Sequence, residues 1–401
     1  MTFSRLFPAS TSFAVVSIFS AALVSCSSPD ASNSAKETFV GRAEIPDTVL
    51  AKDARAGVAG SPLQEVASFQ GPELVGIAAM PTGGRLFVSF PRWGNNPTYP
   101  VAELGPNSSL KPYPDAGWCM WNDSVKSEPG KHWICPQAVV ADKKGFLWVV
   151  DPAAPGLDYA IAGGSKLVKI DPRTNKVVKN IVFDRKLASE HSYLNDVRID
   201  TDRNVAYLTD SGLGALVVVD LTTQKARQVL LNHPSTKAEP GVVLTVAGHK
   251  MIDNQGKPMQ LNADGIALSP DNEYLYYHVV TGYSLYRIKT AALRNAALSE
   301  EQLGQQVENL GKTPATDGMI MDAQNNLYLT AIEDNAIVRR TPAGKLETVV
   351  KDERLQWPDT YSYTPNGTLY VTTSQIHKMP ITNQGVSRQQ EPFHLYKLSV
   401  K

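Results

Sequence analysis

The stretch DGMIMDAQNNLYLTAI, residues 317–332, contains the pattern on which the fold depends. A short apolar run follows Asp317 and leads into a polar turn at residues 322–326, after which a second apolar run begins. Two short strand-like runs joined by a tight polar turn are typical of a β-hairpin. The segment therefore predicts two antiparallel strands, of which the first starts at Asp317.

The same arrangement occurs six times along the chain. The six units start at Gly76, Gln137, Asp196, Asp264, Asp317 and Asp359. A third strand-like run often follows the hairpin, as in ALVVVDL at residues 215–221. Units of four strands that recur every 40 to 70 residues, roughly, indicate propeller blades. We therefore predict an all-β fold, a six-bladed β-propeller over residues 61–401.

The last unit has room for only three strands before the chain ends. The run LQEVASF, residues 63–69, precedes the first unit and belongs to no blade of its own. We expect it to pair with HLYKLSV, residues 394–400, which would close the ring and leave no open sheet edge there. The clearest helix signal lies at residues 290–307, where Ser299 and Gln302 form a predicted capping box. We place this helical segment between the fourth and fifth blades.

The first 60 residues do not share the propeller pattern. Residues 13–24, FAVVSIFSAALV, follow Arg5 and form an apolar run of 12 residues, which fits a signal peptide better than a transmembrane helix. LVSC, residues 23–26, resembles the lipobox of bacterial lipoproteins, which implies cleavage after residue 25 and acylation of Cys26. Residues 26–60 then predict a flexible tether. We expect a lipid-anchored protein of the cell envelope, facing the periplasm or the exterior, with the outer membrane favoured because Ser27 is not aspartate.

The amino-acid composition limits the classes of molecule that the protein is expected to bind. The chain has 39 basic and 39 acidic side chains, so no basic excess favours nucleic acid, and we expect no nucleic-acid partner. We expect a monomer whose partners are a small-molecule ligand and, through the lipid anchor, a membrane. Export also favours a disulfide between the two remaining cysteines, Cys119 and Cys135, with two free thiols as the alternative.

Several segments resemble the major royal jelly protein and yellow family. The segment RLFVSFPRWGNNPTYPVAEL, residues 85–104, resembles the Pro-Arg-Trp signature of that family, and the resemblance continues in order to about residue 400. Its bacterial members are described as related to L-dopachrome tautomerase. The resemblance implies a six-bladed propeller with a ligand site at the central channel, and insect members include binders of biogenic amines. The chain departs from the family pattern at Asp151-Pro152-Ala153, where many members have Asp-Ser-Gly.

The aspartates that start the units are the candidate ligand-binding groups. Each starts an innermost strand, so we expect these side chains near the axis, where clustered carboxylates need a proton, a metal ion or an organic cation between them. Aromatic side chains at the rim could add cation–π contacts to an amine. The alternative is that each aspartate accepts backbone N–H groups in a turn. The expected ligand-binding residues are Asn195, Asp196, Asp264, Asp317, Asp359, Trp357, Tyr283 and Trp93.

Three functions remain open. In the first, the channel binds a small aromatic or amine compound, with tautomerase-like proton transfer by Asp264 and His278, the candidate catalytic residues. The second is a metal-dependent lactonase, because LNDVRID at residues 194–200 resembles the metal segment of gluconolactonase-type propellers; its ligands to Ca²⁺ or Zn²⁺ would be Asn195, Asp196 and Asp264. In those enzymes a glutamate precedes Gly-Pro, whereas this chain has Gln70 there. The third is a non-catalytic surface scaffold.

Overall fold

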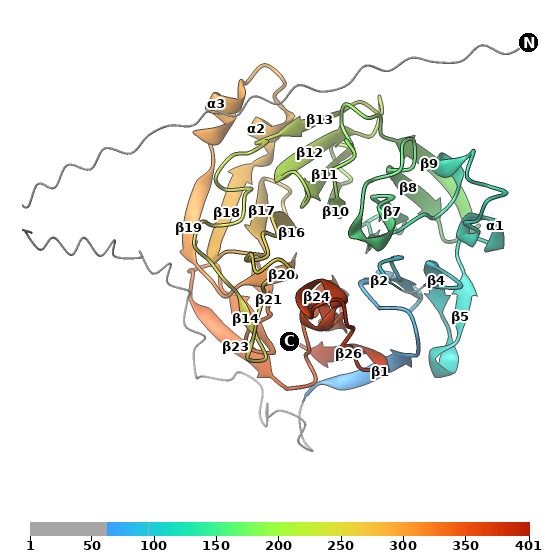
Figure 1. Ribbon diagram of the computed structural model, residues 1–401. Helices are drawn as coiled ribbons and strands as arrows, with labels where there is room; N and C mark the ends of the chain where they lie inside the picture. The colour runs from blue at the N-terminus through green and yellow to red at the C-terminus, as the bar shows by residue number, and fades with distance from the viewer. Residues whose placement is uncertain (1–61, 95) are drawn as a thin grey trace, which may run out of the picture. The chain divides into compact units, whose positions relative to one another are not determined.

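The described part of the chain is built from six four-stranded antiparallel sheets. The computed structural model describes residues 62–94 and 96–401. The predicted signal peptide, the acylated Cys26 and the tether lie outside the described residues. Figure 1 shows the six sheets arranged radially, with the first strand of each sheet innermost. The predicted all-β, six-bladed propeller is confirmed.

The strands follow the chain from the inside of each blade to the outside. Blade 1 comprises β2 (Gly76–Ala79), β3 (Leu86–Ser89), β4 (Val101–Leu104) and β5 (Leu110–Pro112). Blade 2 comprises β6 (Ala138–Ala141), β7 (Leu147–Asp151), β8 (Lys166–Asp171) and β9 (Lys176–Val182). Blade 3 comprises β10 (Leu194–Asp200), β11 (Val205–Asp210), β12 (Ala215–Asp220) and β13 (Ala226–Val229).

The second half of the ring repeats this order. Blade 4 comprises β16 (Ala263–Leu268), β17 (Tyr274–Val279), β18 (Ser284–Lys289) and β19 (Glu308–Lys312). Blade 5 comprises β20 (Thr316–Met321), β21 (Leu327–Ala331), β22 (Ala336–Arg340) and β23 (Leu346–Lys351). Blade 6 comprises β24 (Pro358–Tyr363), β25 (Thr368–Thr373), β26 (Phe393–Ser399) and, as its outer strand, β1 (Gln64–Phe69).

The ring closes through β1, as predicted. This strand pairs antiparallel with β26, with Gln64 opposite Lys397 and Phe69 opposite Phe393. The ring of Phe69 also packs edge-on against Phe90 of the neighbouring first blade, with centroids 5.3 Å apart. The first strand of the described chain therefore completes the last blade and joins it to the first.

The hydrophobic core lies between the blades rather than in one central mass. Each pair of adjacent blades shares a cluster of buried side chains; Leu167 of blade 2, for example, packs in one cluster with Leu208 of blade 3. Corresponding clusters join the other neighbouring blades. The axis is thus left to the side chains of the six innermost strands.

The short helices lie in the connections. They are η1 (Pro106–Ser108), α1 (Ala116–Cys119), η2 (Pro129–Lys131), η3 (Pro155–Leu157), α2 (Thr290–Arg294), α3 (Glu300–Gly304), η4 (Ile376–Lys378) and η5 (Pro380–Thr382). A small hairpin, β14 (Thr245–Val246) and β15 (His249–Lys250), lies in the connection between blades 3 and 4. Within the described residues, no helix combines the length and apolar composition needed to cross a bilayer.

The helical segment differs from the prediction in its place. The capping box of Ser299 and Gln302 is present at the start of α3. However, α2 and α3 connect β18 to β19, so the segment lies inside blade 4 and not between blades 4 and 5. The placement was wrong because the outer strand β19, ENLGK, has little of the apolar alternation by which the other strands were found.

The predicted disulfide is also wrong. Cys119 and Cys135 are both buried free thiols. The Sγ atom of Cys119, at the end of α1, lies 3.5 Å from the carbonyl oxygen of Val101 and packs between blades 1 and 2. Cys135 packs in a different apolar cluster, beside Trp93. The two thiols therefore occupy separate clusters, and burial raises the pKa of Cys119 to about 11.

Candidate functional site

A β-bulge at the start of four innermost strands positions the polar residues of the channel. In β10, β16, β20 and β24 the pairing with the second strand shifts over two residues that oppose no single partner. Those pairs are Asn195–Asp196, Asp264–Gly265, Asp317–Gly318 and Asp359–Thr360. A bulge bends the strand and re-aims its side chains, which explains why the acids sit where regular pairing begins.

The strand register shows that Asp196 is not equivalent to the aspartates that start the other units. Asn195, not Asp196, occupies the position of Asp264, Asp317 and Asp359, because each of these four residues is the first in its bulge. We call the side chains of Asn195, Asp264, Asp317 and Asp359 the acid ring. The sequence could not show the offset, because LNDVRID contains two adjacent polar residues and either could start the bulge.

The pKa values of the three carboxyls in the acid ring are all raised. Burial, followed by the charges of Asp317 and Asp359, raises the pKa of Asp264 well above its ordinary value. Burial raises the pKa of Asp317 to about 6, although the indole of Trp357 lowers it. Burial and then Asp317 raise the pKa of Asp359 well above its ordinary value. The charges of Asp317 on Asp264 and on Asp359 indicate that the carboxyls of blades 4, 5 and 6 lie close to one another.

The carboxyls of the acid ring are buried to different extents. Asp317 and Asp359 are 6% and 3% exposed, whereas Asp264 keeps more of its surface accessible while its carboxyl is still surrounded by protein. The Oδ2 atom of Asp359 is buried and has no hydrogen bond of normal geometry to any described residue. The hydroxyl of Ser374 nevertheless lies close enough to lower the pKa of Asp359. An unsatisfied buried carboxylate oxygen is costly and commonly marks the place of a proton, water or ligand.

Neutral donors, rather than cations, contact the ring. The side-chain amide of Asn195 donates to Oδ2 of Asp264 at 2.6 Å, and Nε1 of Trp357 donates to Oδ2 of Asp317 at 2.6 Å. The hydroxyl of Thr360 donates to Oδ1 of Asp359 at 2.9 Å. Among the described residues, no lysine or arginine is hydrogen-bonded to the three carboxyls.

Two expected aromatic residues lie beside these polar groups. Trp357 is fully buried and bonded to the ring as described. Trp93 donates from Nε1 to the hydroxyl of Tyr193, which in turn donates to the side-chain oxygen of Gln137, the residue before β6. The charge of Asp264 contributes to the raised pKa of Tyr193, so this chain of bonds ends near the ring. Tyr283 packs in one cluster with Trp357, and its hydroxyl donates to Glu333 at 3.1 Å.

His278 is not brought together with the acid ring. It lies on β17, fully buried, with Nδ1 2.6 Å from the carbonyl oxygen of Val279 and Nε2 2.9 Å from the hydroxyl of Thr313. Burial lowers its pKa to about 4, so the imidazole is neutral at ordinary pH. His278 lies opposite the bulge of blade 4, as Thr209 lies opposite the bulge of blade 3. Thr209 donates to the carbonyl oxygen of Asp264 in the next blade, so a polar residue at this position of the second strand has a structural role.

Several further groups near the ring are not among the expected site residues. Glu73 is buried, its Oε1 atom has no hydrogen-bond partner among the described residues, and burial raises its pKa to about 8. Its charge acts on Asp359. His377 stacks on Trp357 with ring centroids 6.1 Å apart, and neither ring nitrogen has a partner in the described chain. Tertiary contacts alone bring these residues to the axis, since none starts a repeat.

Asp196 makes an ion pair of its own beside the acid ring, and its charge also raises the pKa of Asp264 and of Asp317. Its Oδ1 atom accepts from Nη1 of Arg198 at 2.9 Å, and Nη2 of Arg198 donates to the carbonyl oxygen of Met319 in blade 5 at 2.6 Å. Burial raises the pKa of Asp196, and Arg198 lowers it. Arg198 was missed, although a basic residue within an innermost strand is a signal that the other five innermost strands lack.

Asn195, Asp196 and Asp264 are the residues expected to bind a divalent metal ion. Among the described residues, no three His, Cys, Asp or Glu side chains are grouped so that they could hold a metal ion. Asn195 is oriented with its amide nitrogen toward Asp264, whereas a metal ligand would present its oxygen. Gln70, at the position of the glutamate in the gluconolactonase pattern, is exposed. The present arrangement of Asn195, Asp196 and Asp264 therefore does not fit a metal site.

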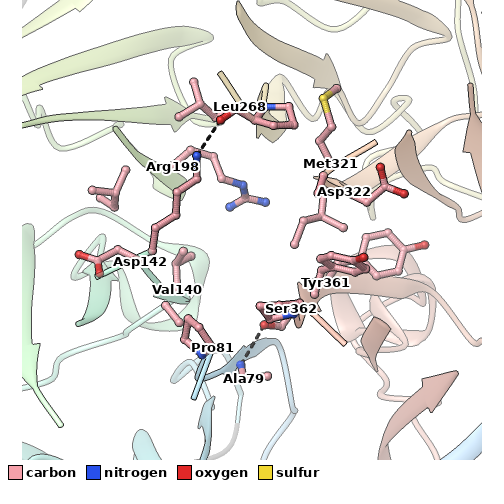
Figure 2. A pocket seen from close by; sticks show the side chains of 18 of the residues that line it. Ala79, Pro81, Val140, Asp142, Arg198, Leu268, Met321, Asp322, Tyr361 and Ser362 are labelled. Carbon is pink, nitrogen blue, oxygen red and sulfur yellow. Dashed lines mark hydrogen bonds between the residues drawn. The ribbon is translucent and has the colours of Figure 1, made fainter. Parts of the chain in front are cut away.

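A cavity occupies the other end of the channel. It has a volume of about 550 Å³ and is lined by the far ends of the innermost strands and by the turns that follow them. Figure 2 shows the guanidinium of Arg198 pointing into this space, with Val140 and Tyr361 on its walls. The hydroxyl of Ser362 accepts the backbone N–H of Ala79 at 2.8 Å, which joins blades 6 and 1 at the wall.

The fold and its axial polar site define a class of protein, the six-bladed propellers with a central channel. Among solved structures of this class, the chain is similar to a gluconolactonase from Xanthomonas campestris (12% identity, 90% of this chain and 96% of that chain, TM-score 0.53). It is also similar to a luciferin-regenerating enzyme (12% identity, 84% and 94%, TM-score 0.51). At these identities the likeness shows the fold alone.

The sequence comparisons identify the family. The model of the major royal jelly protein family matches residues 134–400, which is most of the chain. The protein therefore belongs to the major royal jelly protein family, as its resemblance implied. Among curated relatives it is similar to major royal jelly proteins 3 and 6 of Apis mellifera, with 23% and 22% identity over 58% and 57% of this chain. The matches cover 43% and 51% of those relatives, about half of their length.

Proposed function

We propose that the protein binds a small organic cation, an aromatic amine, at the acid ring. The observation that carries this proposal is the group of three carboxyls, Asp264, Asp317 and Asp359, which has no lysine or arginine bonded to it among the described residues. Two carboxylates about 5 Å apart repel by roughly 3 kcal/mol at an effective dielectric constant near 20. An ammonium group would remove that repulsion and donate to the unsatisfied Oδ2 of Asp359.

The surroundings suit an aromatic body as well as a charge. Trp357 contacts Asp317 through its indole N–H, and Trp93 is linked to the ring region through Tyr193, so two aromatic residues belong to the surroundings of the carboxyls. A cation that is held against an aromatic face gains about 0.5–2 kcal/mol. The family membership is consistent with this choice of ligand, because the family resemblance implies amine binding in the channel.

The test compares an amine with its uncharged counterpart. Phenethylamine and phenethyl alcohol are titrated calorimetrically into the wild-type protein and the Asp264→Asn variant. We expect the amine to bind at least tenfold more tightly than the alcohol, and Asp264→Asn to remove that preference. Affinity should rise from pH 5 to pH 8, because the ammonium displaces protons from carboxyls whose pKa is raised, Asp317 to about 6.

The matched control is Asp158→Asn, which neutralises an exposed aspartate outside the channel. Its amine binding should equal that of the wild type. Equal affinity for amine and alcohol, or full amine affinity in Asp264→Asn, would overturn the proposal.

A second candidate function is proton transfer of the tautomerase type. It is favoured by two neighbouring carboxyls of raised pKa, Asp317 at about 6 and Asp264 well above its ordinary value, because one carboxyl can accept a proton while its neighbour donates one. Dopachrome conversion that is abolished by Asp317→Asn would support it. The lactonase alternative predicts instead that the protein hydrolyses lactones and that a chelator stops this hydrolysis.

Attachment to the envelope through acylated Cys26 stays a proposal that radiolabelled palmitate incorporation would test.

A further inference from the structure

The cavity at the far end of the channel has the properties of a second ligand site. Its volume of about 550 Å³ lies within the range of small-molecule sites, about 300–1,000 Å³. It begins where the acid ring ends: Arg198 follows Asn195 by three residues along β10, which corresponds to roughly 10 Å. The acid ring and the cavity therefore lie at different depths along the innermost strands.

The walls of the cavity are largely apolar. Ile77, Val140 and Ile320 come from the innermost strands of blades 1, 2 and 5, and Tyr361 adds an aromatic surface from blade 6. Figure 2 shows Val140 and Tyr361 at the edge of an open space. A ligand with an apolar or aromatic body would bury its surface there, at about 25 cal/mol per Å².

The acids in the lining are already used by their own turns. Oδ1 of Asp142 accepts from the N–H groups of Lys144 and Phe146, and its Oδ2 accepts from Trp148 at 2.8 Å. The carboxylate of Asp322 is held in the same way within its turn, by backbone and side-chain donors. Figure 2 shows both carboxylates directed away from the cavity. They therefore present few free acceptors to a ligand.

Arg198 presents the donors at the inner end. Nη1 is bonded to Asp196 and to the carbonyl oxygen of Val197, and Nη2 donates once, to Met319. Among the described residues no acceptor is bonded to Nε, and Nη2 has a second hydrogen to donate. Asp196 approaches the guanidinium through Nη1, and the Nε edge is the one left for a second acid. Lys143 is a second cationic residue of the lining, and its Nζ donates to the carbonyl oxygen of Pro270 at 2.8 Å.

We propose that this cavity binds a small, largely apolar carboxylic acid. Its carboxylate accepts from Nε and Nη2 of Arg198, and its body lies against Val140, Ile320 and Tyr361. A guanidinium edge matches a carboxylate with two parallel hydrogen bonds, whereas an ammonium ion would be repelled. This site is independent of the amine site proposed for the acid ring.

Three ligands of one shape test the charge preference. The wild-type protein is titrated with 3-phenylpropanoate, 3-phenylpropanamide and 3-phenylpropylamine in a calorimeter. We expect the acid to bind at least tenfold more tightly than the amide, and the amine to bind more weakly than either. An acid and an amide of equal affinity would overturn the proposal.

Two variants locate the binding. Val140→Phe fills the cavity from the wall and leaves Arg198 in place, so it should weaken the acid at least tenfold. The double variant Asp196→Asn/Arg198→Met removes both members of the buried ion pair, so no buried charge is left alone. It should lose the preference for acid over amide. The control Val178→Phe makes the same enlargement at an exposed position of β9 and should bind as the wild type does. Acid binding that Val140→Phe leaves unchanged would overturn the assignment.

Discussion

Glu73 illustrates how strongly single side chains in this channel depend on their surroundings. The residue is 7% exposed, one carboxyl oxygen has no partner in the described chain, and burial raises its pKa to about 8. With Asp264, Asp317 and Asp359 it forms a group of acids that hold protons in the folded state at pH values where the unfolded chain has released them. Such groups are characteristic of functional sites, where charge is kept ready for a ligand.

The protonation of these residues predicts how stability depends on pH. A carboxyl whose folded pKa lies above its unfolded value binds more protons in the folded state, so stability falls as pH rises between the two values. For Glu73 that window runs from about 4.5 to about 8. Glu73→Gln should therefore raise the free energy of unfolding at pH 8 by on the order of a few kcal/mol and change it little at pH 4.5.

Urea unfolding of both proteins at pH 4.5, 6 and 8 provides the measurement. The exposed residue Glu353 supplies the control, since Glu353→Gln should change stability equally little at all three values. A gain from Glu73→Gln that is as large at pH 4.5 as at pH 8 would contradict the assigned pKa.

At the scale of the strand, a hydroxyl on the second strand links neighbouring blades. Ser89 Oγ accepts the N–H of Gly76 and donates to the carbonyl oxygen of Gln137 in the next blade at 2.6 Å. Thr209 makes the corresponding bond to the carbonyl oxygen of Asp264, and Thr372 to that of Val75. A hydroxyl residue near the end of the second strand thus hydrogen-bonds to the backbone at the start of the innermost strand of the neighbouring blade and holds it in place.

The glycines after two ring aspartates serve the same close contact. A Cβ atom on Gly318 would lie 1.9 Å from the carbonyl oxygen of Asp359, and one on Gly265 would lie 2.2 Å from that of Asp317. No side chain fits at either place without moving the blades apart. The dipeptide Asp-Gly in blades 4 and 5 therefore reflects packing between blades as well as the chemistry of the aspartate.

Thr372→Val tests the hydroxyl link without changing the shape of the side chain. It removes the donor to the carbonyl oxygen of Val75 and the acceptor for the N–H of Thr360, both in buried surroundings. We expect a loss of about 1–3 kcal/mol in the free energy of unfolding. Thr245→Val, on exposed β14, is the matched control and should cost less than about 0.5 kcal/mol. Equal losses in the two variants would contradict the proposed link.

For the molecule as a whole, the ring depends on a strand from the other end of the described chain. β1 is the outer strand of blade 6, and Phe69 connects that blade to Phe90 of blade 1. Removal of β1 would expose the edge of β26 along its length and open a buried cluster between blades 6 and 1. Open sheet edges also favour aggregation.

Two truncated proteins test the closure. One starts at Pro62 and keeps β1, and the other starts at Gly71 and lacks it. We expect the shorter protein to melt at least about 10 °C lower or to aggregate, since it loses several buried side chains at once. Thermal unfolding and gel filtration measure both effects. Identical melting temperatures would show that β1 does not close the ring.

Much of this architecture was accessible from the sequence, but the site was accessible only in outline. The six hairpin repeats and the orphan run at residues 63–69 predicted the blades and their closure, because alternation along a strand directly reflects which face is buried. The acids of blades 4, 5 and 6 were placed correctly near the axis. Asp196 was placed one position out of register, because a bulge adds a residue without altering the alternation on either side of it.

The remaining differences arise from contacts between distant parts of the chain. Cys119 and Cys135 stay reduced because the packing of blade 1 directs them into separate clusters. His278 lies in a blade interior, where both of its nitrogens are bonded. Glu73, His377 and Arg198 reach the axis from a loop, a short helix and a strand that carry no shared motif.

The amino-acid sequence by itself determined the number of blades, their order and the strand that closes them, because these follow from local strand-and-turn patterns repeated along the chain. The tertiary structure alone decided which side chains meet on the axis, with three buried carboxyls of raised pKa toward one end and Arg198 facing the cavity at the other. The physical reason is that proximity and burial set the charge and the free hydrogen-bonding groups of a site, and both exist only after the blades pack against one another.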